Sequence, residues 1–147
     1  MKFVNFSFSN PVQSSTLIGL GCEWDLHNYS DFAGFKFDPL EDCLRIEWLV
    51  PAVENPWGCT ENRTKGCALK FKNLKRVEVT ARDKATLSLE DACLLGISKV
   101  IPDRTEHRFK AEWQDDEPFH LLLEFESGRT IEVASDTAEL ELVEGTL

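Results

Sequence analysis

Residues 119–133, FHLLLEFESGRTIEV, decide the fold class of this 147-residue chain. Apolar residues stand at every second position on either side of a central ESG, which is the period of strands that bury one face. A three-residue loop over 126–128, with Gly128 in the left-handed conformation, sets Leu123 opposite Ile131. A two-residue turn would oppose Leu123 to a glutamate. The stretch therefore predicts an antiparallel hairpin with the longer loop.

The same period continues upstream and predicts a second hairpin. Residues 109–113 alternate apolar and charged side chains, and placing Trp113 opposite Phe119 keeps the apolar residues of both segments on one face. The other face then sets His120 opposite Glu112. Both faces agree on this register, so we expect the segments before and after residues 114–118 to pair.

Shorter alternating segments predict further strands at 4–8, 35–37, 44–50, 67–71, 77–79 and 140–142. The proline and acidic residues of 38–42 suit a turn, so the strands at 35–37 and 44–50 are expected to form a hairpin. Residues 88–95, closed by Gly96, predict one short helix. Residues 1–147 are therefore expected to form a single, mainly β domain. The predicted architecture is an antiparallel sandwich or partly open barrel of about eight short strands with one short helix.

The five cysteines, Cys22, Cys43, Cys59, Cys67 and Cys93, are expected to be free thiols. Polar residues interrupt the apolar residues near the N-terminus, so no secretory signal is predicted and a cytoplasmic, reducing location is expected. The cysteines and histidines lack the close spacing of a zinc site, so neither metal nor cofactor is expected. No apolar run approaches the roughly 20 residues of a membrane span. Cys93 is assigned to the core rather than to catalysis.

The charges are unevenly distributed along the chain, whose net charge is −10. Residues 63–84 contain eight lysine or arginine residues against two acidic ones, whereas residues 112–147 contain eleven acidic residues and only Arg129. The acidic segment would repel the phosphates of nucleic acids and membranes and attract a basic protein. Stacking of nucleic-acid bases on Trp57 and Phe71 beside the basic residues is the less favoured interpretation.

We expect a non-enzymatic protein-interaction function, of the immunity or inhibitor type, in which an acidic surface binds a basic partner protein. The residues expected to steer that partner are acidic residues of a loop and of the last strand: Asp115, Asp116, Glu117, Glu139, Glu141 and Glu144. The same charges are also explained by solvated strand faces whose only role is to keep the protein soluble. The sequence does not decide between a monomer and a homo-oligomer.

The alternative is a small metal-dependent or acid–base enzyme centred on Asp25 and His27. On a strand, Glu23, Asp25 and His27 would project to one face and present two carboxylates and an imidazole. A solvated loop with local capping hydrogen bonds explains the same residues and is preferred. The sequence motifs of serine hydrolases, zinc proteases and phosphate-binding loops are absent from the sequence.

Overall fold

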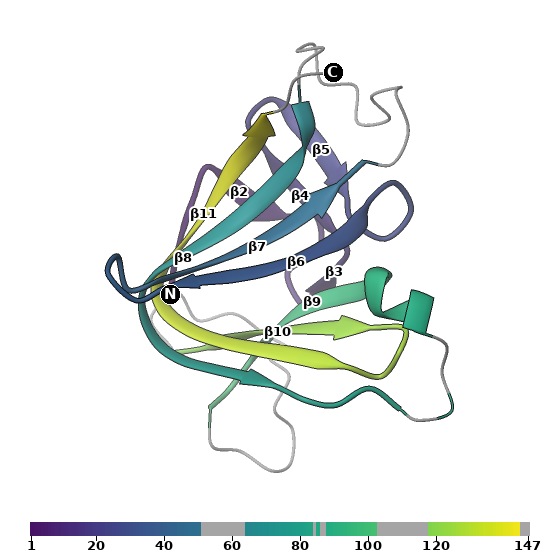
Figure 1. The fold of residues 1–147 in the computed structure, drawn as a ribbon. Coiled ribbons are helices and arrows are strands. Elements are labelled where there is room, and N and C mark those ends of the chain that lie inside the picture. Colours follow the sequence, from purple (N-terminus) through teal and green to yellow (C-terminus); the bar gives the residue numbers. More distant parts are fainter. Residues whose placement is uncertain (51–63, 84, 86–87, 103–117, 145–147) are drawn as a thin grey trace.

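The computed structural model describes residues 1–50, 64–83, 85, 88–102 and 118–144 (Figure 1). These residues form eleven strands and one 3-10 helix, η1. In chain order the elements are β1 (Lys2–Val4), β2 (Phe6–Phe8), β3 (Gln13–Ser14), β4 (Thr16–Gly19), β5 (Cys22–Asp25), β6 (Asp31–Asp38), β7 (Cys43–Leu49), β8 (Thr64–Val79), η1 (Ser88–Ala92), β9 (Leu94–Val100), β10 (His120–Phe125) and β11 (Thr130–Glu144).

Seven strands form one strongly curled antiparallel sheet in the order β3-β9-β10-β11-β8-β7-β6 (Figure 1). β1 joins this sheet by pairing in parallel with β11. The long strands β8 and β11 share a register shift between Ala134 and Ser135, next to Asn73, whose φ of 52° is in the left-handed region. Such bulges bend and twist a strand, which explains how two long strands follow the curl of the sheet.

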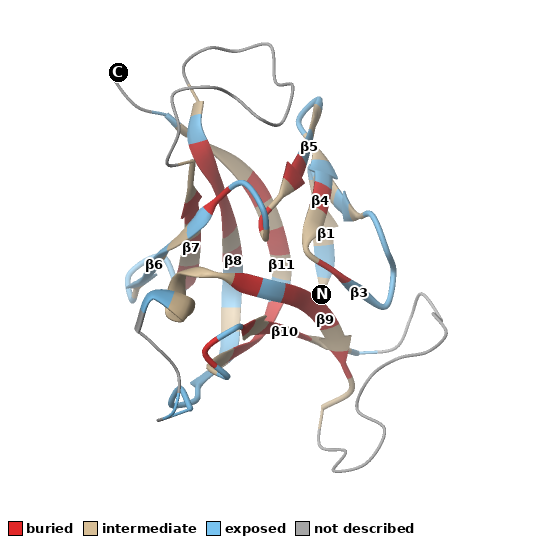
Figure 2. Ribbon diagram, turned by 90° about the vertical axis from the view of Figure 1, so that its right-hand side faces the viewer, coloured by how far each residue is buried: buried red, intermediate tan, exposed pale blue. Residues whose placement is uncertain are grey.

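A small sheet, β2-β4-β5, lies against the concave side of the large sheet (Figures 1 and 2). Leu17 and Trp24 of the small sheet are completely buried and share one apolar cluster with Trp48 and Leu140 of the large sheet. The indole Nε1–H of Trp24 donates to the carbonyl oxygen of Gly19 at 3.0 Å, which satisfies its single polar atom. The core is therefore enclosed between two sheets.

The two ends of the large sheet, β6 and β3, do not pair with each other in the described residues. The 3-10 helix η1 contacts β6, and Phe32 of β6 packs against Phe125 of β10 with ring centroids 4.9 Å apart. Side chains and η1 therefore close part of the gap, and the sheet is a partly open barrel. The predicted mainly β, antiparallel class is confirmed.

The hairpin of β10 and β11 has the predicted register. Leu121 pairs with Val133 and Leu123 with Ile131, and Gly128 has a φ of 80°. The amide of Gly128 donates to the carbonyl of Phe125 at 3.0 Å, which closes the three-residue loop. Ser127 of the same loop is fully buried, so it is not the exposed loop residue that a surface turn would suggest.

Replacing Gly128 with valine is expected to lower the free energy of unfolding by about 1 to 2 kcal/mol or more, because a β-branched residue is strained at positive φ. A Cβ atom at this position would be 3.4 Å from the Cβ of Asp83, so the strain comes from the backbone and not from crowding. Gly128→Asn is the matched control, since asparagine tolerates this conformation. Urea denaturation checks the difference, and equal losses for both variants would contradict it.

The second predicted hairpin is wrong in its pairing. Residues 103–117 lie outside the described residues, but β10 uses both of its edges, one for β9 and the other for β11. His120 pairs with Val100, and its Nδ1 lies 2.8 Å from a carboxylate oxygen of Glu132. The alternation of apolar and charged residues in 109–113 carries no information that β9 pairs with this edge of β10.

The predicted helix is also shorter than expected. Only Ser88–Ala92 is helical, as a 3-10 helix, and Leu94–Val100 forms β9 with Gly96 buried inside the strand. Pairing with β10 on one side and β3 on the other supplies hydrogen bonds that outweigh the local helical pattern. None of the helices described has the length and apolar character needed to span a bilayer.

The predicted first strand is divided between the two sheets. Asn5 has a φ of 66° and separates β1, in the large sheet, from β2, in the small sheet. The reversal brings the rings of Phe3 and Phe6 together with centroids 4.7 Å apart, and Phe8 packs edge-on against Phe3. In contrast, the predicted segments 67–71 and 77–79 are parts of one strand, β8.

Candidate functional site

The acidic residues predicted to steer a partner are divided by the structure. Glu139, Glu141 and Glu144 lie on β11, and Asp115, Asp116 and Glu117 lie outside the described residues. Glu139 forms an ion pair with Lys72 of β8, and Glu141 forms one with Arg45 of β7. Two of the three described carboxylates are therefore neutralised by neighbouring strands, while Glu144 is exposed.

The basic segment and the acidic segment lie side by side in the sheet. β8 carries most of the basic residues, and it pairs along nearly its whole length with the acidic strand β11. Lys75 of β8 forms an ion pair with Asp136 at the start of the bulged part of β11. Part of the charge separation in the sequence is thus resolved into two cross-strand pairs, Lys72 with Glu139 and Lys75 with Asp136, which stabilise the sheet.

Asp25 has a structural role in the loop between β5 and β6. Its Oδ1 accepts hydrogen bonds from the amides of His27 and Asn28 at 3.1 and 3.0 Å, and its Oδ2 accepts one from Asn28 Nδ2 at 2.7 Å. β5 ends at Asp25, so Glu23, Asp25 and His27 do not share one strand face. The capping interpretation accounts for Asp25, and the imidazole of His27 is directed elsewhere.

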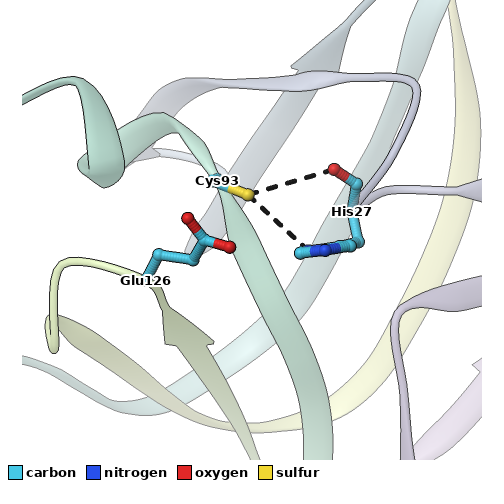
Figure 3. A group of neighbouring side chains, drawn as sticks. All are labelled: His27, Cys93 and Glu126. Carbon is cyan, nitrogen blue, oxygen red and sulfur yellow. Dashed lines mark hydrogen bonds between the residues drawn. The ribbon is translucent and has the colours of Figure 1, made fainter.

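His27 lies in a cluster with Cys93 and Glu126, whose ligand-type side-chain atoms are all within 4.8 Å of one another (Figure 3). The three residues come from different parts of the fold: His27 from the β5–β6 loop, Cys93 from the link between η1 and β9, and Glu126 from the β10–β11 turn. His27 and Cys93 are half-buried and Glu126 is exposed. In Figure 3 the Glu126 carboxylate and the His27 ring both point toward the Cys93 sulfur.

The imidazole of His27 has a defined hydrogen-bond pattern. Its Nδ1 is 2.7 Å from the carbonyl oxygen of Leu94 and 3.6 Å from Cys93 Sγ. A carbonyl oxygen only accepts, so Nδ1 carries the hydrogen and the lone pair of the neutral ring is on Nε2. Nδ1 therefore cannot take the proton of the Cys93 thiol, which argues against a cysteine–histidine nucleophile.

The surroundings of Cys93 point the same way. Burial raises the pKa of its thiol above the usual value, and the carboxylate of Glu126 raises it further. Asp31 and Glu90 act in the same direction. Because a reactive cysteine needs a lowered pKa, Cys93 is not an activated nucleophile. The same acidic surroundings favour a cation.

The backbone holds the three residues of the cluster in place. The amide of Glu126 donates to the carbonyl of Cys93 at 3.0 Å, which joins the β10–β11 turn to the start of β9. The amide of Leu26, next to His27, donates to the carbonyl of Ser15 at 2.8 Å. The sequence analysis missed this cluster, because 66 residues separate His27 from Cys93 and no local motif joins them.

The cysteines differ from the expectation of five free thiols. Cys43, Cys67 and Cys93 are free, Cys22 is disulfide-bonded, and Cys59 lies outside the described residues. The prediction that Cys67 is unbridged is confirmed; burial in β8 raises the pKa of its thiol. The prediction is wrong for Cys22, since contacts between distant segments cannot be read from spacing.

A second surface feature is a groove of about 410 Å³ beside the edge strand β6. Phe35 and Phe37 of β6 face the groove with 47% and 51% of their surface exposed. They pair with Ile46 and Leu44, which are buried, so both rings lie on the core face of the sheet, where the described side chains cover them only in part. Leu44 also lines the groove, together with Asp42, Leu74, Lys75, Arg76 and Val77.

Comparison of the chain with known protein families, with curated proteins and with solved structures found no match. Among the described residues, the cluster of His27, Cys93 and Glu126 and the groove beside β6 are the two features that suit a ligand or a partner.

Proposed function

We propose that this protein is a non-enzymatic binding protein that takes up an extended, basic segment of a partner protein along the edge of β6. The observation that carries the proposal is the pair of half-exposed rings, Phe35 and Phe37, on an edge strand of eight residues. The outer edge of β6 pairs with none of the described strands, and η1 and Phe125 contact the strand without hydrogen-bonding to it as a sheet neighbour. An apolar edge strand of this kind favours pairing with another chain. A partner strand would add main-chain hydrogen bonds to β6 and place alternate side chains against the two rings.

The charges around β6 indicate the chemistry of the partner. Residues 29–42 contain four acidic residues and one basic residue, Lys36. Exposed Glu41 and Asp42 lie in the turn after β6, and exposed Asp31 begins the strand. The two basic residues that line the groove, Lys75 and Arg76, form ion pairs with Asp136 and Glu78. A partner segment with lysine or arginine between its apolar residues would complement the carboxylates at the two ends of β6, and the long-range field of a chain of net charge −10 would speed its approach.

The same charges disfavour a second copy of this chain as the occupant. If the β6 strands of two copies paired in antiparallel orientation, Asp31 at the start of one strand would lie near the acidic end and turn of the other strand. Like charges directly opposite each other destabilise strand pairs. A basic partner removes this repulsion, so we place the proposed function in hetero-association, in agreement with the interaction role expected from the acidic composition.

The experiment uses short synthetic peptides that alternate leucine or valine with lysine, and the same peptides with glutamate in place of lysine. Fluorescence anisotropy should detect binding of the basic peptides, and the double variant Phe35→Ser, Phe37→Ser should weaken it about tenfold or more, as loss of buried aromatic anchors does. Ile18→Ser is the matched control, since Ile18 is 46% exposed on the small sheet, away from the groove.

Binding should also weaken as salt is raised, because exposed charges are screened. Equal binding of the acidic peptides, or an unchanged affinity in the double variant, would contradict the proposal. So would a homodimer in analytical ultracentrifugation that the double variant converts to monomer, because the edge would then be filled by a second copy.

A further inference from the structure

We propose that His27, Cys93 and Glu126 form a zinc-binding site. The site is independent of the proposed groove beside β6, and it is built from three side chains that distant parts of the chain bring together (Figure 3). Imidazole nitrogen, cysteine sulfur and carboxylate oxygen are the three ligand types that zinc uses in proteins. Magnesium and calcium prefer oxygen ligands alone, so the donor set selects a softer ion.

The distances suit a small tetrahedral ion. Zinc bonds of about 2.0 to 2.3 Å set neighbouring ligand atoms about 3.3 to 3.7 Å apart. One ligand-type atom of each side chain lies within 4.8 Å of the others. The histidine nitrogen that lies 3.6 Å from Cys93 Sγ is Nδ1, which donates to Leu94 O, so an ion would bind through Nε2 of the same ring. Rotation of the Cys93 and Glu126 side chains, of which Glu126 is exposed on the β10–β11 turn, brings their ligand atoms toward Nε2 and to the spacing that zinc needs.

The second hydrogen bond of the histidine fits a metal ligand. Zinc-bound histidines typically donate their other ring N–H to a carboxylate or a backbone carbonyl, which fixes the ring and its tautomer. Leu94 O fills this role for His27 Nδ1 at 2.7 Å. The lone pair on Nε2 is then available to bind the ion, so both ring nitrogens of His27 have a partner.

The polypeptide prepares the site before an ion binds. The hydrogen bond from Glu126 N to Cys93 O couples two of the ligand residues directly through the backbone. The amide of Cys93 donates to the carbonyl of Glu90, which fixes the end of η1. Ligands held in this way lose little conformational freedom on binding, which raises affinity for the ion.

The charges around the site complete the argument. The carboxylate of Glu126 brings a negative charge to within 4.8 Å of the ligand-type atoms of His27 and Cys93. A divalent cation would offset this charge, and zinc would bind the sulfur as thiolate, with release of the thiol proton. Three protein ligands leave one position of a tetrahedral ion for water. The inference thus identifies a chemical site that the cysteine and histidine spacing in the sequence did not predict.

The test measures zinc binding to the full chain by isothermal titration calorimetry, in buffer without thiols or chelators. We expect one zinc per chain with a Kd below about 1 µM. Cys93→Ala and Glu126→Gln should each weaken binding at least tenfold, and Cys43→Ala is the matched control, because Cys43 is a free, buried cysteine on β7 outside the cluster. Cobalt should give a sulfur-to-metal charge-transfer absorption that Cys93→Ala removes.

Circular dichroism and thermal melting of each variant without zinc separate loss of the site from loss of the fold. Zinc should raise the melting temperature of the wild type and of Cys43→Ala but not that of Cys93→Ala. Absence of stoichiometric binding by the folded wild type would overturn the inference. Unchanged binding in both Cys93→Ala and Glu126→Gln would also overturn it, because the ion would then be held elsewhere.

Discussion

Replacing Gly66 with alanine is expected to cost at least about 3 kcal/mol of folding free energy, a large part of the roughly 5 to 15 kcal/mol typical of a domain. Gly66 is buried in β8, between Leu49 of β7 and Val143 of β11. A Cβ atom there would be 1.9 Å from the carbonyl oxygen of Trp48 and 3.0 Å from the Cα of Leu49. Both neighbours are backbone, so the clash is relieved only by moving β7 away from β8.

Gly96→Ala is the matched control for this prediction. Gly96 is also buried in a central strand, but the atoms that its Cβ would meet belong to the side chain of Gln13, at 3.0 Å or more. That exposed side chain can turn aside, so we expect a cost of about 1 kcal/mol or less. Urea denaturation of both variants measures the difference. Similar stabilities for the two would show that β7 approaches β8 less closely at Gly66.

The sequence was most informative where local rules determine the structure. The register of β10 and β11 follows from the alternation around Leu123 and from the glycine needed at position 128, both of which act within a few residues. The hairpin of β6 and β7 follows in the same way from the turn chemistry after Phe37. These features needed no knowledge of distant contacts.

The sequence was least informative where a strand pairs on both edges with strands that are far away in the sequence, as β9 does with β3 and β10. β9 was interpreted as the end of a helix, because Leu94 and Leu95 follow a helical pattern that begins at Ser88. Burial of Leu94 and Ile97 under the opposite sheet requires a strand, which is a tertiary effect. β3, β4 and β5 were not predicted, since they are strands of two to four residues.

The candidate sites illustrate the same limit. Charge composition indicated an acidic surface, but it did not show that Glu139 and Glu141 face Lys72 and Arg45. The grouping of His27 with Cys93 depends on where the β5–β6 loop meets the start of β9, and no residue spacing encodes that meeting. From residue types alone, His27 was grouped with Glu23 and Asp25, Cys93 was assigned to the core, and Glu126 received no role.

The second large effect is expected at Trp24, which fastens the small sheet to the large one. Its side chain is completely buried in the shared core, and its indole donates to Gly19 O. Trp24→Ala leaves a large cavity and an unsatisfied carbonyl, so it should lower the free energy of unfolding by about 3 to 5 kcal/mol. Trp24→Phe keeps most of the ring packing and should cost about half as much.

The loss at Trp24 should be concentrated in the small sheet. β5 leads directly from Trp24 into the loop of His27, and the Leu26 amide is hydrogen-bonded to Ser15 O at 2.8 Å. Native-state hydrogen exchange of Trp24→Phe should therefore show a larger loss of protection at Leu26 than at Leu123 in the centre of β10, because local unfolding follows the weakened element. Ile18→Ala, a change at a half-exposed position of the same sheet, should leave both amides protected. Equal losses of protection at Leu26 and Leu123 in Trp24→Phe would mean that the two sheets unfold as one unit, and that Trp24 stabilises the whole core without being the particular anchor of the His27 loop.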